Sequence, residues 1–211
     1  MQVRPVTPER LAEELADRIA DRPGHPWLRV AVDGAPPAGP GVLADALVDR
    51  LRVRGRAVLR VSGGDFLRPA SLRFEHGRTD PDAFYEDWLD AGALSREVLE
   101  PLGPGGAGRV LPALWSVETD RSVRAGYVSL GAGGVLVLDG ALLLGHGLPF
   151  DLTVHLWLSP AALARRLGAE RRWTLPAYER YDRAVEPLLT ADIVVRADDP
   201  RRPALVDRVA S

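Results

Sequence analysis

A glycine-rich segment follows a buried apolar run and has the spacing of a phosphate-binding loop. Gly34 and Gly39 stand five positions apart, and Pro40 and Gly41 come directly after them. In a GxxxxGK[ST] loop the backbone N–H groups surround phosphate oxygens, the lysine neutralises the β- and γ-phosphates, and the Ser/Thr hydroxyl holds Mg²⁺. Here the lysine and hydroxyl positions are Pro40 and Gly41, and proline also lacks a backbone N–H. The spacing predicts phosphate binding, but the residue types lack the groups that phosphoryl transfer uses.

Arginines near residue 170 are the candidate cations for such a site. All 27 basic residues of the chain are arginine, and a guanidinium binds phosphate through two parallel hydrogen bonds. Residues 165–175 carry four of these arginines and are a candidate anion-contacting segment; the alternative is a solvated helix face. The residues expected to contact phosphate or nucleotide are Gly34, Ala38, Gly39, Pro40, Gly41, Arg166, Arg171 and Arg172.

Two aspartates, Asp33 and Asp139, each end an apolar run. Both are candidate acidic residues of the site, and the alternative is that they cap turns or helix N-termini. His146 follows the Asp139 run closely enough to reach the same cleft, with a hydrogen-bonded turn histidine as the alternative. The four histidines show no metal-ligand spacing.

Composition excludes several classes of function. The chain has no cysteine, which excludes disulfides, thiolate catalysis and cysteine-bound metals. The net charge of -2 and pI near 6.1 provide no general attraction to nucleic acid. No apolar run of 18 residues is present, so no membrane partner is expected and the predicted location is cytoplasmic.

Five short apolar runs alternate with helical or loop-like sequence. Continuous rather than alternating apolar character is typical of strands covered on both faces, as in a parallel sheet. The runs are Leu28–Asp33, Ala57–Ser62, Gly134–Asp139, Leu152–Ser159 and Ala191–Val195. We therefore predict a three-layer α/β fold with a five-stranded parallel sheet, whose ligands bind at the carboxyl ends of the strands.

Helices are predicted between these strands, and several would begin at a proline, a favoured first helical residue. The predicted helices are Pro8–Asp21, Val42–Arg54, Pro81–Leu99, Pro160–Leu167, Pro176–Leu189 and the C-terminal tail from Arg202. Residues 102–124 are rich in glycine and then irregular, which predicts an insertion or hairpin over the site. The 211 residues are expected to form one domain, with an N-terminal helix within residues 1–24.

Taken in order, the motifs resemble the uridine kinase-like branch of the P-loop nucleoside kinases, in its actinobacterial form. The motifs are VAVDG (30–34), SGGDFLRP (62–69), FEHGRTDPDAFYEDWLD (74–90), LEPLGPGG (99–106), TDRSVR (119–124), VLVLDGALLL (135–144) and ADIVVRADDPRRP (191–203). The resemblance implies a P-loop kinase fold with an arginine lid at residues 165–175, and it implies that Asp139 is a catalytic carboxylate that would orient a water on Mg²⁺. It also implies transfer of the γ-phosphate of a nucleoside triphosphate to the 5′-hydroxyl of uridine or cytidine with Mg²⁺.

The chain departs from that family at the positions that carry the chemistry. Gly64 stands where the resemblance implies the catalytic aspartate, and Asp65 follows one residue late. The family's next substrate aspartate corresponds to Thr79, with Asp80 adjacent. Trp115 lies in the region where the family grips the nucleoside, without the family's aspartate and histidine. The resemblance thus implies substrate contacts at Arg68, Thr79, Asp80 and Trp115.

Two functions remain open. The first is a nucleoside-kinase fold that no longer transfers phosphate and acts as a binding, regulatory or assembly module, with a nucleotide, a nucleoside, an unknown protein or a second copy of itself as partner. The alternative is an active kinase that uses ATP and Mg²⁺. In that case a lid arginine such as Arg172 would replace the loop lysine, Asp65 or Asp80 would be the base, and Asp139 would serve the metal.

Overall fold

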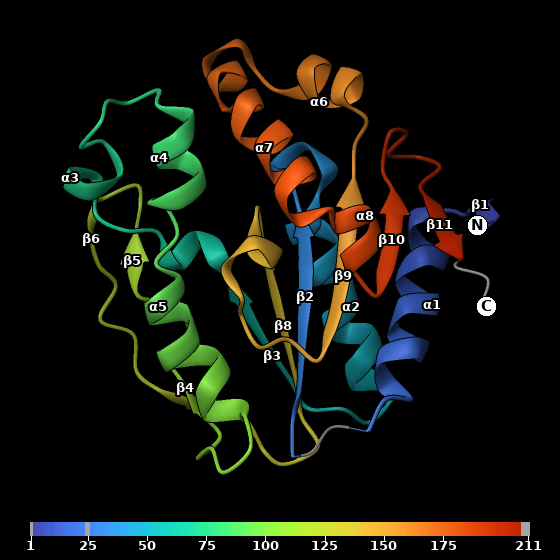
Figure 1. Ribbon diagram of the computed structural model, residues 1–211. Coiled ribbons are helices and arrows are strands. Elements are labelled where there is room, and N and C mark those ends of the chain that lie inside the picture. The colour runs from blue at the N-terminus through green and yellow to red at the C-terminus, as the bar shows by residue number, and fades with distance from the viewer. Residues whose placement is uncertain (1, 24–25, 208–211) are drawn as a thin grey trace.

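The computed structural model of the protein describes residues 2–23 and 26–207, which fold around a seven-stranded sheet (Figure 1). Five parallel strands form its greater part. In spatial order they are β10 (Ile193–Arg196), β9 (Leu152–Trp157), β2 (Leu28–Gly34), β8 (Val135–Gly140) and β3 (Val58–Ser62). The strands β11 (Ala204–Asp207) and β1 (Gln2–Pro5) continue the sheet beyond β10 in antiparallel orientation. The α/β fold with a mostly parallel sheet is confirmed.

The five predicted strands are present, each within two residues of the predicted bounds. The prediction of a five-stranded sheet was wrong because β1 and β11 add to it. The tail from Arg202 was predicted as a helix, yet residues 204–207 form β11 between β10 and β1. Leu205 is fully buried there. Pairing with two neighbouring strands decides the conformation of this short segment, which has little intrinsic preference of its own.

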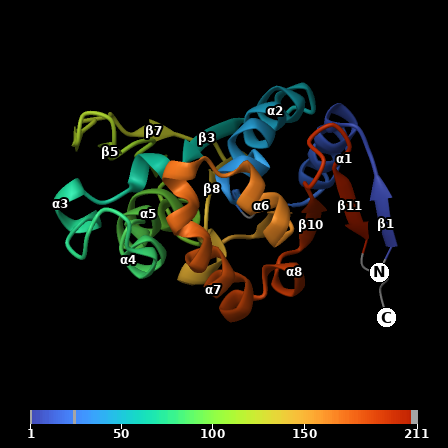
Figure 2. The ribbon, with the colours of Figure 1, turned by 90° about the horizontal axis from the view of Figure 1, so that it is seen from above.

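Helices cover both faces of the sheet. The first pair, α1 (Pro8–Ala20) and α2 (Pro40–Val53), lies on one side, whereas α4 (Pro81–Glu86), α5 (Ala91–Leu94) and α7 (Leu175–Val185) lie on the other (Figure 2). Three short helices, α3 (Ala70–Arg73), α6 (Pro160–Arg166) and α8 (Pro187–Thr190), complete the set. Successive residues of β2 point to opposite faces, so that Val30 and Val32 belong to the core under α1 and α2, and Ala31 to the core under α5. No helix among the described residues is long and apolar enough to span a bilayer.

Two predicted helices are interrupted. The range Pro81–Leu99 is not one helix: residues 88–90 leave the helical path and pair with the segment that follows β3. Arg68 N donates to Trp88 O (2.9 Å) and Asp90 N donates to Phe66 O (2.8 Å). The chain continues through α5 into a π-helical turn, Ser95–Leu99. The range Pro176–Leu189 is broken where Glu186 takes a left-handed conformation (φ 50°) between α7 and α8.

The segment from residue 102 to β8 contains two pairs of short strands. The pairs are β4 (Arg109–Val110) with β7 (Val128–Ser129) and β5 (Trp115–Ser116) with β6 (Arg121–Ser122). Residues 115–122 therefore form a hairpin. Its attachment point is the turn after β3, where Leu114 N donates to Asp65 O at 3.0 Å.

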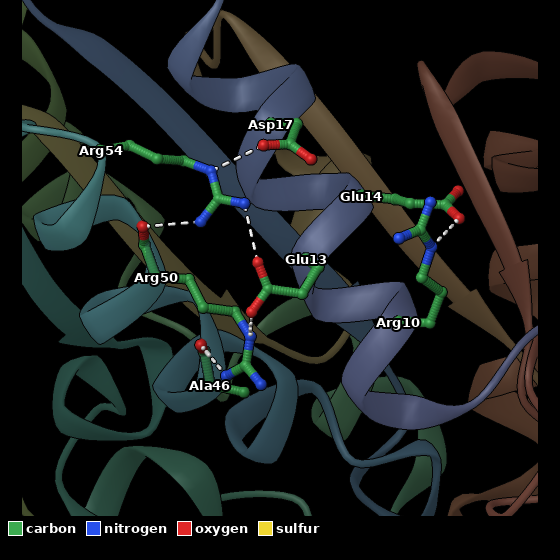
Figure 3. A network of polar contacts seen from close by, with 7 residues as sticks. All are labelled: Arg10, Glu13, Glu14, Asp17, Ala46, Arg50 and Arg54. Carbon is green, nitrogen blue, oxygen red and sulfur yellow. Dashed lines mark hydrogen bonds and ion pairs between the residues drawn. The ribbon is translucent and has the colours of Figure 1, made fainter.

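Ion pairs hold α1 against α2, the helix that follows the glycine loop (Figure 3). Glu13 of α1 bridges Arg50 and Arg54 of α2, and Arg54 also pairs with Asp17 (2.7 Å). On another side of α1, Glu14 accepts from Arg10 (2.9 Å) and from Arg4 of β1 (2.6 Å). These contacts join the strand and helix at the N-terminus to the helix that supports the loop.

The Glu14 pairs predict a pH dependence of stability. The hydrogen bond from Arg4, followed by that from Arg10, lowers the pKa of Glu14 from 4.5 to about 2. Because the folded pKa is depressed, this stabilisation is fully present above pH 4.5 and is lost as the pH falls toward 2. We expect Glu14→Gln to lower the free energy of unfolding by about 1 kcal/mol at pH 7.

Urea unfolding of both proteins, near neutral pH and again in acid, checks this expectation. The difference in the free energy of unfolding between the parent protein and Glu14→Gln should shrink in acid, because Glu14 of the parent protein is then protonated. An Asp49→Asn control, whose pair with Arg52 is exposed, should cost almost nothing under either condition. If Glu14→Gln lowered the free energy of unfolding equally at both pH values, the ion pairs of Glu14 would not be the source of the stabilisation.

Candidate functional site

A cavity of about 380 Å³ opens at the carboxyl ends of β2, β3 and β8. This is the edge where parallel α/β sheets bind ligands. Its lining comes from four segments: the glycine loop and first turn of α2, the turn after β3, the end of α4 with the following turn, and the residues after β8. Arg171 adds to these. The lining residues are Gly34, Pro36, Gly39, Pro40, Gly41, Val42, Ser62, Gly63, Gly64, Leu67, Phe84, Tyr85, Trp88, Leu89, Asp139, Gly140, Ala141, Leu142, Leu143, His146 and Arg171.

Much of the backbone hydrogen bonding of the glycine loop is internal to the loop. Residues 36–38 form a 3₁₀ turn in which Ala38 N donates to Ala35 O (2.8 Å) and Gly39 N donates to Pro36 O (3.0 Å). Among residues 34–41, three are prolines without an N–H. The loop therefore offers few of the free N–H groups with which a phosphate-binding loop surrounds an anion.

Asp139 carries an internal counter-ion. Its Oδ1 atom lies 2.7 Å from Nη1 of Arg60 on the neighbouring strand β3. The same guanidinium donates from Nε to Asp45 of α2 at 2.9 Å. Asp139 is 9% exposed, so the ion pair is shielded from water.

Gly41 leaves the space in which this pair lies. A Cβ atom added at residue 41 would stand 3.2 Å from Oδ2 of Asp139 and 3.7 Å from Nη2 of Arg60. This is the position at which a phosphate-binding loop carries its metal-binding hydroxyl. A guanidinium thus stands beside Asp139 and residue 41, where a loop with a hydroxyl would place a metal ion. No group of three histidine, aspartate or glutamate side chains suited to a metal occurs within residues 2–23 and 26–207.

Asp65 lies beside the cavity without lining it. It belongs to a 3₁₀ turn, Gly63–Phe66, whose Gly63 and Gly64 line the cavity instead. Burial is the main reason that the pKa of Asp65 is raised, with a further increase from the negative charge of Asp139 and a smaller opposing effect of Arg60. The predicted catalytic role of Asp65 has no test here and stays a prediction.

Asp33 is the centre of a buried hydrogen-bond network. Its side chain is fully buried at the end of β2, where Oδ1 accepts from Leu143 N (2.9 Å). The Oδ2 atom accepts from the Tyr181 hydroxyl (2.8 Å) and lies 2.6 Å from Nδ1 of His155. Tyr181 accepts in turn from Leu144 N (3.2 Å). One carboxylate therefore ties together β2, β9, α7 and the turn after β8, and the first and last of these border the cavity.

An aromatic cluster forms one wall. Phe84 packs edge-on against Trp88, with ring centroids 5.1 Å apart, and both contact Trp173 at 5.6 Å. The guanidinium of Arg171 lies 5.7 Å from the Trp88 ring centroid. Such contacts favour flat apolar ligands over strongly hydrated ones.

Part of the sequence-predicted site comes together here. The predicted residues that line the cavity are Gly34, Gly39, Pro40, Gly41, Asp139, His146 and Arg171. The others do not line it: Ala38, Asp65, Arg68, Thr79, Asp80, Trp115, Arg166 and Arg172. None of residues 102–124 lines it either.

Several of the residues outside the cavity have other partners. Asp80 accepts from Ala83 N and caps α4, and Trp115 donates to Asp120. Arg166 donates to the carbonyl oxygens of Ala197 and Asp198 at the end of β10.

Sequence reasoning missed Arg60, Phe84, Tyr85 and Trp88. A charged residue in the middle of an apolar strand, as Arg60 is in β3, was a usable signal, because it requires an internal partner. In the sequence, Phe84 and Trp88 have the i,i+4 spacing of one helical face, which is equally typical of core packing. That pattern could not distinguish a cavity wall from a filled core.

Comparison with known proteins identifies the fold. No protein-family model matches the chain, and no curated protein matches it. Among solved structures, the "possible uridine kinase" of Bacillus stearothermophilus superposes with a TM-score of 0.71 at 22% identity, over 88% of this chain and 97% of that one. A "putative fructose transport system kinase" of Silicibacter sp. TM1040 superposes with a TM-score of 0.58 at 20% identity, over 86% and 94%. The protein therefore has the fold of P-loop kinases.

The Asp33 network predicts a large loss of stability on truncation. We expect Asp33→Ala to lower the free energy of unfolding by at least about 3 kcal/mol, because three buried donors lose their acceptor. For a chain of this size the melting temperature should fall by roughly 6 to 12 °C. Calorimetry of this variant beside Asp49→Ala, which alters an exposed residue of α2, checks the prediction. A similar small shift in both variants would show that the network contributes little.

The Arg60–Asp139 pair predicts a measurable coupling. In a double-mutant cycle of Arg60→Ala with Asp139→Asn, we expect a coupling free energy of about 1.5 to 3 kcal/mol, because each single change leaves a shielded polar group without its partner. The cycle of Arg60→Ala with Asp45→Asn is the control. Asp45 is largely exposed, so its coupling should stay below about 0.5 kcal/mol. Equal coupling in the two cycles would place the important contact of Arg60 outside the cavity.

Proposed function

We propose that the protein is a small-molecule-binding member of the P-loop kinase fold that does not transfer phosphate. The observation that carries the proposal is the guanidinium of Arg60 on Asp139, beside Gly41. Asp139 has its positive partner already, and residue 41 offers no hydroxyl. A magnesium ion at this place would have to displace an internal cation from a shielded carboxylate.

The residues present do not fit a magnesium nucleotide. Pro40 brings neither a charge nor an N–H to the γ-phosphate position, and the N–H groups of Ala38 and Gly39 are bonded within the loop. Catalysis of phosphoryl transfer depends on such cations, metals and N–H groups. We therefore derive no phosphoryl-transfer step for this chain.

What supports binding is the cavity itself. Its volume of about 380 Å³ lies within the range of small-molecule sites, and aromatic and leucine side chains form much of its wall. The alternative is an active kinase in which a lid arginine replaces the lysine, Asp65 or Asp80 is the base and Asp139 serves the metal. It is less well supported because neither Asp65 nor Asp80 lines the cavity and Arg60 already lies against Asp139.

The proposal predicts weak or absent nucleotide binding. We expect calorimetric titration with Mg·ATP, Mg·ADP and uridine to give no saturable heat corresponding to a Kd below about 1 mM. Incubation with Mg·ATP and a panel of nucleosides and sugars should give no more nucleoside diphosphate than buffer alone. Micromolar binding that requires Mg²⁺ and is abolished by Asp139→Asn would overturn the proposal in favour of the kinase alternative. The melting temperature of each sample, measured in parallel, ensures that only folded protein is compared.

A further inference from the structure

The cavity has an uneven distribution of charge. Arg171, on the 3₁₀ segment Ala169–Thr174, is the single arginine among its lining residues. Its guanidinium is half-buried and has no carboxylate partner among the residues that the structure describes. The second candidate cation, His146, has its pKa lowered, chiefly by burial, which disfavours its charged form. The positive charge of the lining therefore stands at the Trp88 end.

A second guanidinium reinforces this end. Arg73 is 3% exposed, and its guanidinium lies 5.2 Å from the Trp88 ring centroid. Arg73 forms an ion pair with Asp120, but its Nη2 atom lies 3.8 Å from the carboxylate oxygen, which is too far for a hydrogen bond. The Arg73 side chain donates instead to a backbone oxygen, Arg68 O, at 2.7 Å.

These two cations act on one another. Burial is the main cause of the lowered pKa of Arg73. The negative charge of Asp120 opposes this effect, and the positive charge of Arg171 lowers the pKa by a smaller amount. A pair of guanidinium groups with incomplete compensation beside an apolar wall is stabilised by an anion placed between the cavity and Arg171. Such an anion would gain its hydrogen bonds from Arg171 and a favourable field from Arg73.

The rest of the lining specifies what the anion is attached to. Phe84, Tyr85, Trp88 and Leu89 contribute three aromatic side chains and one aliphatic side chain to the lining. Gly63, Gly64 and Gly140 also belong to the lining and add no side chains to it. Aromatic walls of this kind select flat, weakly hydrated groups, because a polar ring would lose hydrogen bonds to water without replacing them.

We propose that the cavity binds a planar apolar ring that carries one anionic group, with the ring against Trp88 and Phe84 and the anion on Arg171. The shared chemistry is a carboxylate or a phosphate monoester on such a ring. This inference rests on the proposed binding function and names its class of ligand.

The test uses the full-length protein and ring-matched probes. Quenching of tryptophan fluorescence and calorimetry measure binding of 2-naphthoate, 2-naphthyl phosphate and the neutral 2-naphthamide. At least one of the two anions should bind tenfold or more tightly than the amide, and the stronger of them identifies the anionic group. Arg171→Gln should reduce that preference to less than about threefold, which corresponds to loss of one charge-assisted contact. Arg172→Gln, on the same 3₁₀ segment but outside the lining, should keep it.

Several results would overturn the inference. These are equal binding of amide and anions, no binding of any probe, or a preference that survives in Arg171→Gln. Tighter binding of uridine monophosphate than of 2-naphthyl phosphate would also overturn it, since the ring would then be polar. Binding without charge preference would leave the proposed function intact, whereas the magnesium-dependent nucleotide titration tests that function separately.

Discussion

Two carboxylates at the carboxyl edge of the sheet, Asp33 and Asp139, are largely shielded from water and need charged or hydrogen-bonding partners. The protein supplies these partners from its own chain. Asp33 receives the Leu143 N–H and the Tyr181 hydroxyl and pairs with His155. Asp139 has Arg60 as its counter-ion, with Nη1 of Arg60 2.7 Å from Oδ1 of Asp139. A shielded charge left alone would cost several kcal/mol, so these partners are requirements of the fold at this edge rather than optional contacts. They also fix what the edge can bind.

Each compensation has a consequence for the cavity. By joining Asp33 to Tyr181, the first network positions α7, which continues directly from the 3₁₀ segment that carries Arg171. The Arg60–Asp139 ion pair places a guanidinium where a loop hydroxyl and a metal ion would otherwise lie. Gly41 leaves room for this guanidinium because it has no side chain. The cavity lies at the carboxyl ends of the strands, where open α/β sheets bind ligands. Its lining includes aromatic rings, glycines and Arg171, which has no carboxylate partner within residues 2–23 and 26–207.

The strands could be predicted from sequence because short, continuous apolar runs bounded by turn residues are typical of buried parallel strands. Prediction failed for residues 204–207, where pairing between β10 and β1 sets the conformation, and for residues 88–90, where backbone hydrogen bonds to the turn after β3 interrupt a helical pattern. Within the site, loop spacing located the glycine loop at the cavity, and the arginine pattern located Arg171. The arginine pattern could not show that Arg171 lines the cavity and Arg172 does not, because the direction of neighbouring side chains on a 3₁₀ turn depends on tertiary packing. Arg60 was visible as a charge within a strand, but its partner required the register between β3 and β8.

The guanidinium of Arg60 lies beside Asp139 and residue 41, where a loop with a hydroxyl would place a metal ion. The most direct measurement is a crystal structure grown with excess MnCl₂ and a nucleoside triphosphate analogue, with anomalous scattering recorded to locate manganese. The account predicts no manganese peak near Asp139 and a guanidinium in contact with its carboxylate. A manganese peak between Asp139 and residue 41, with Arg60 turned away, would contradict it.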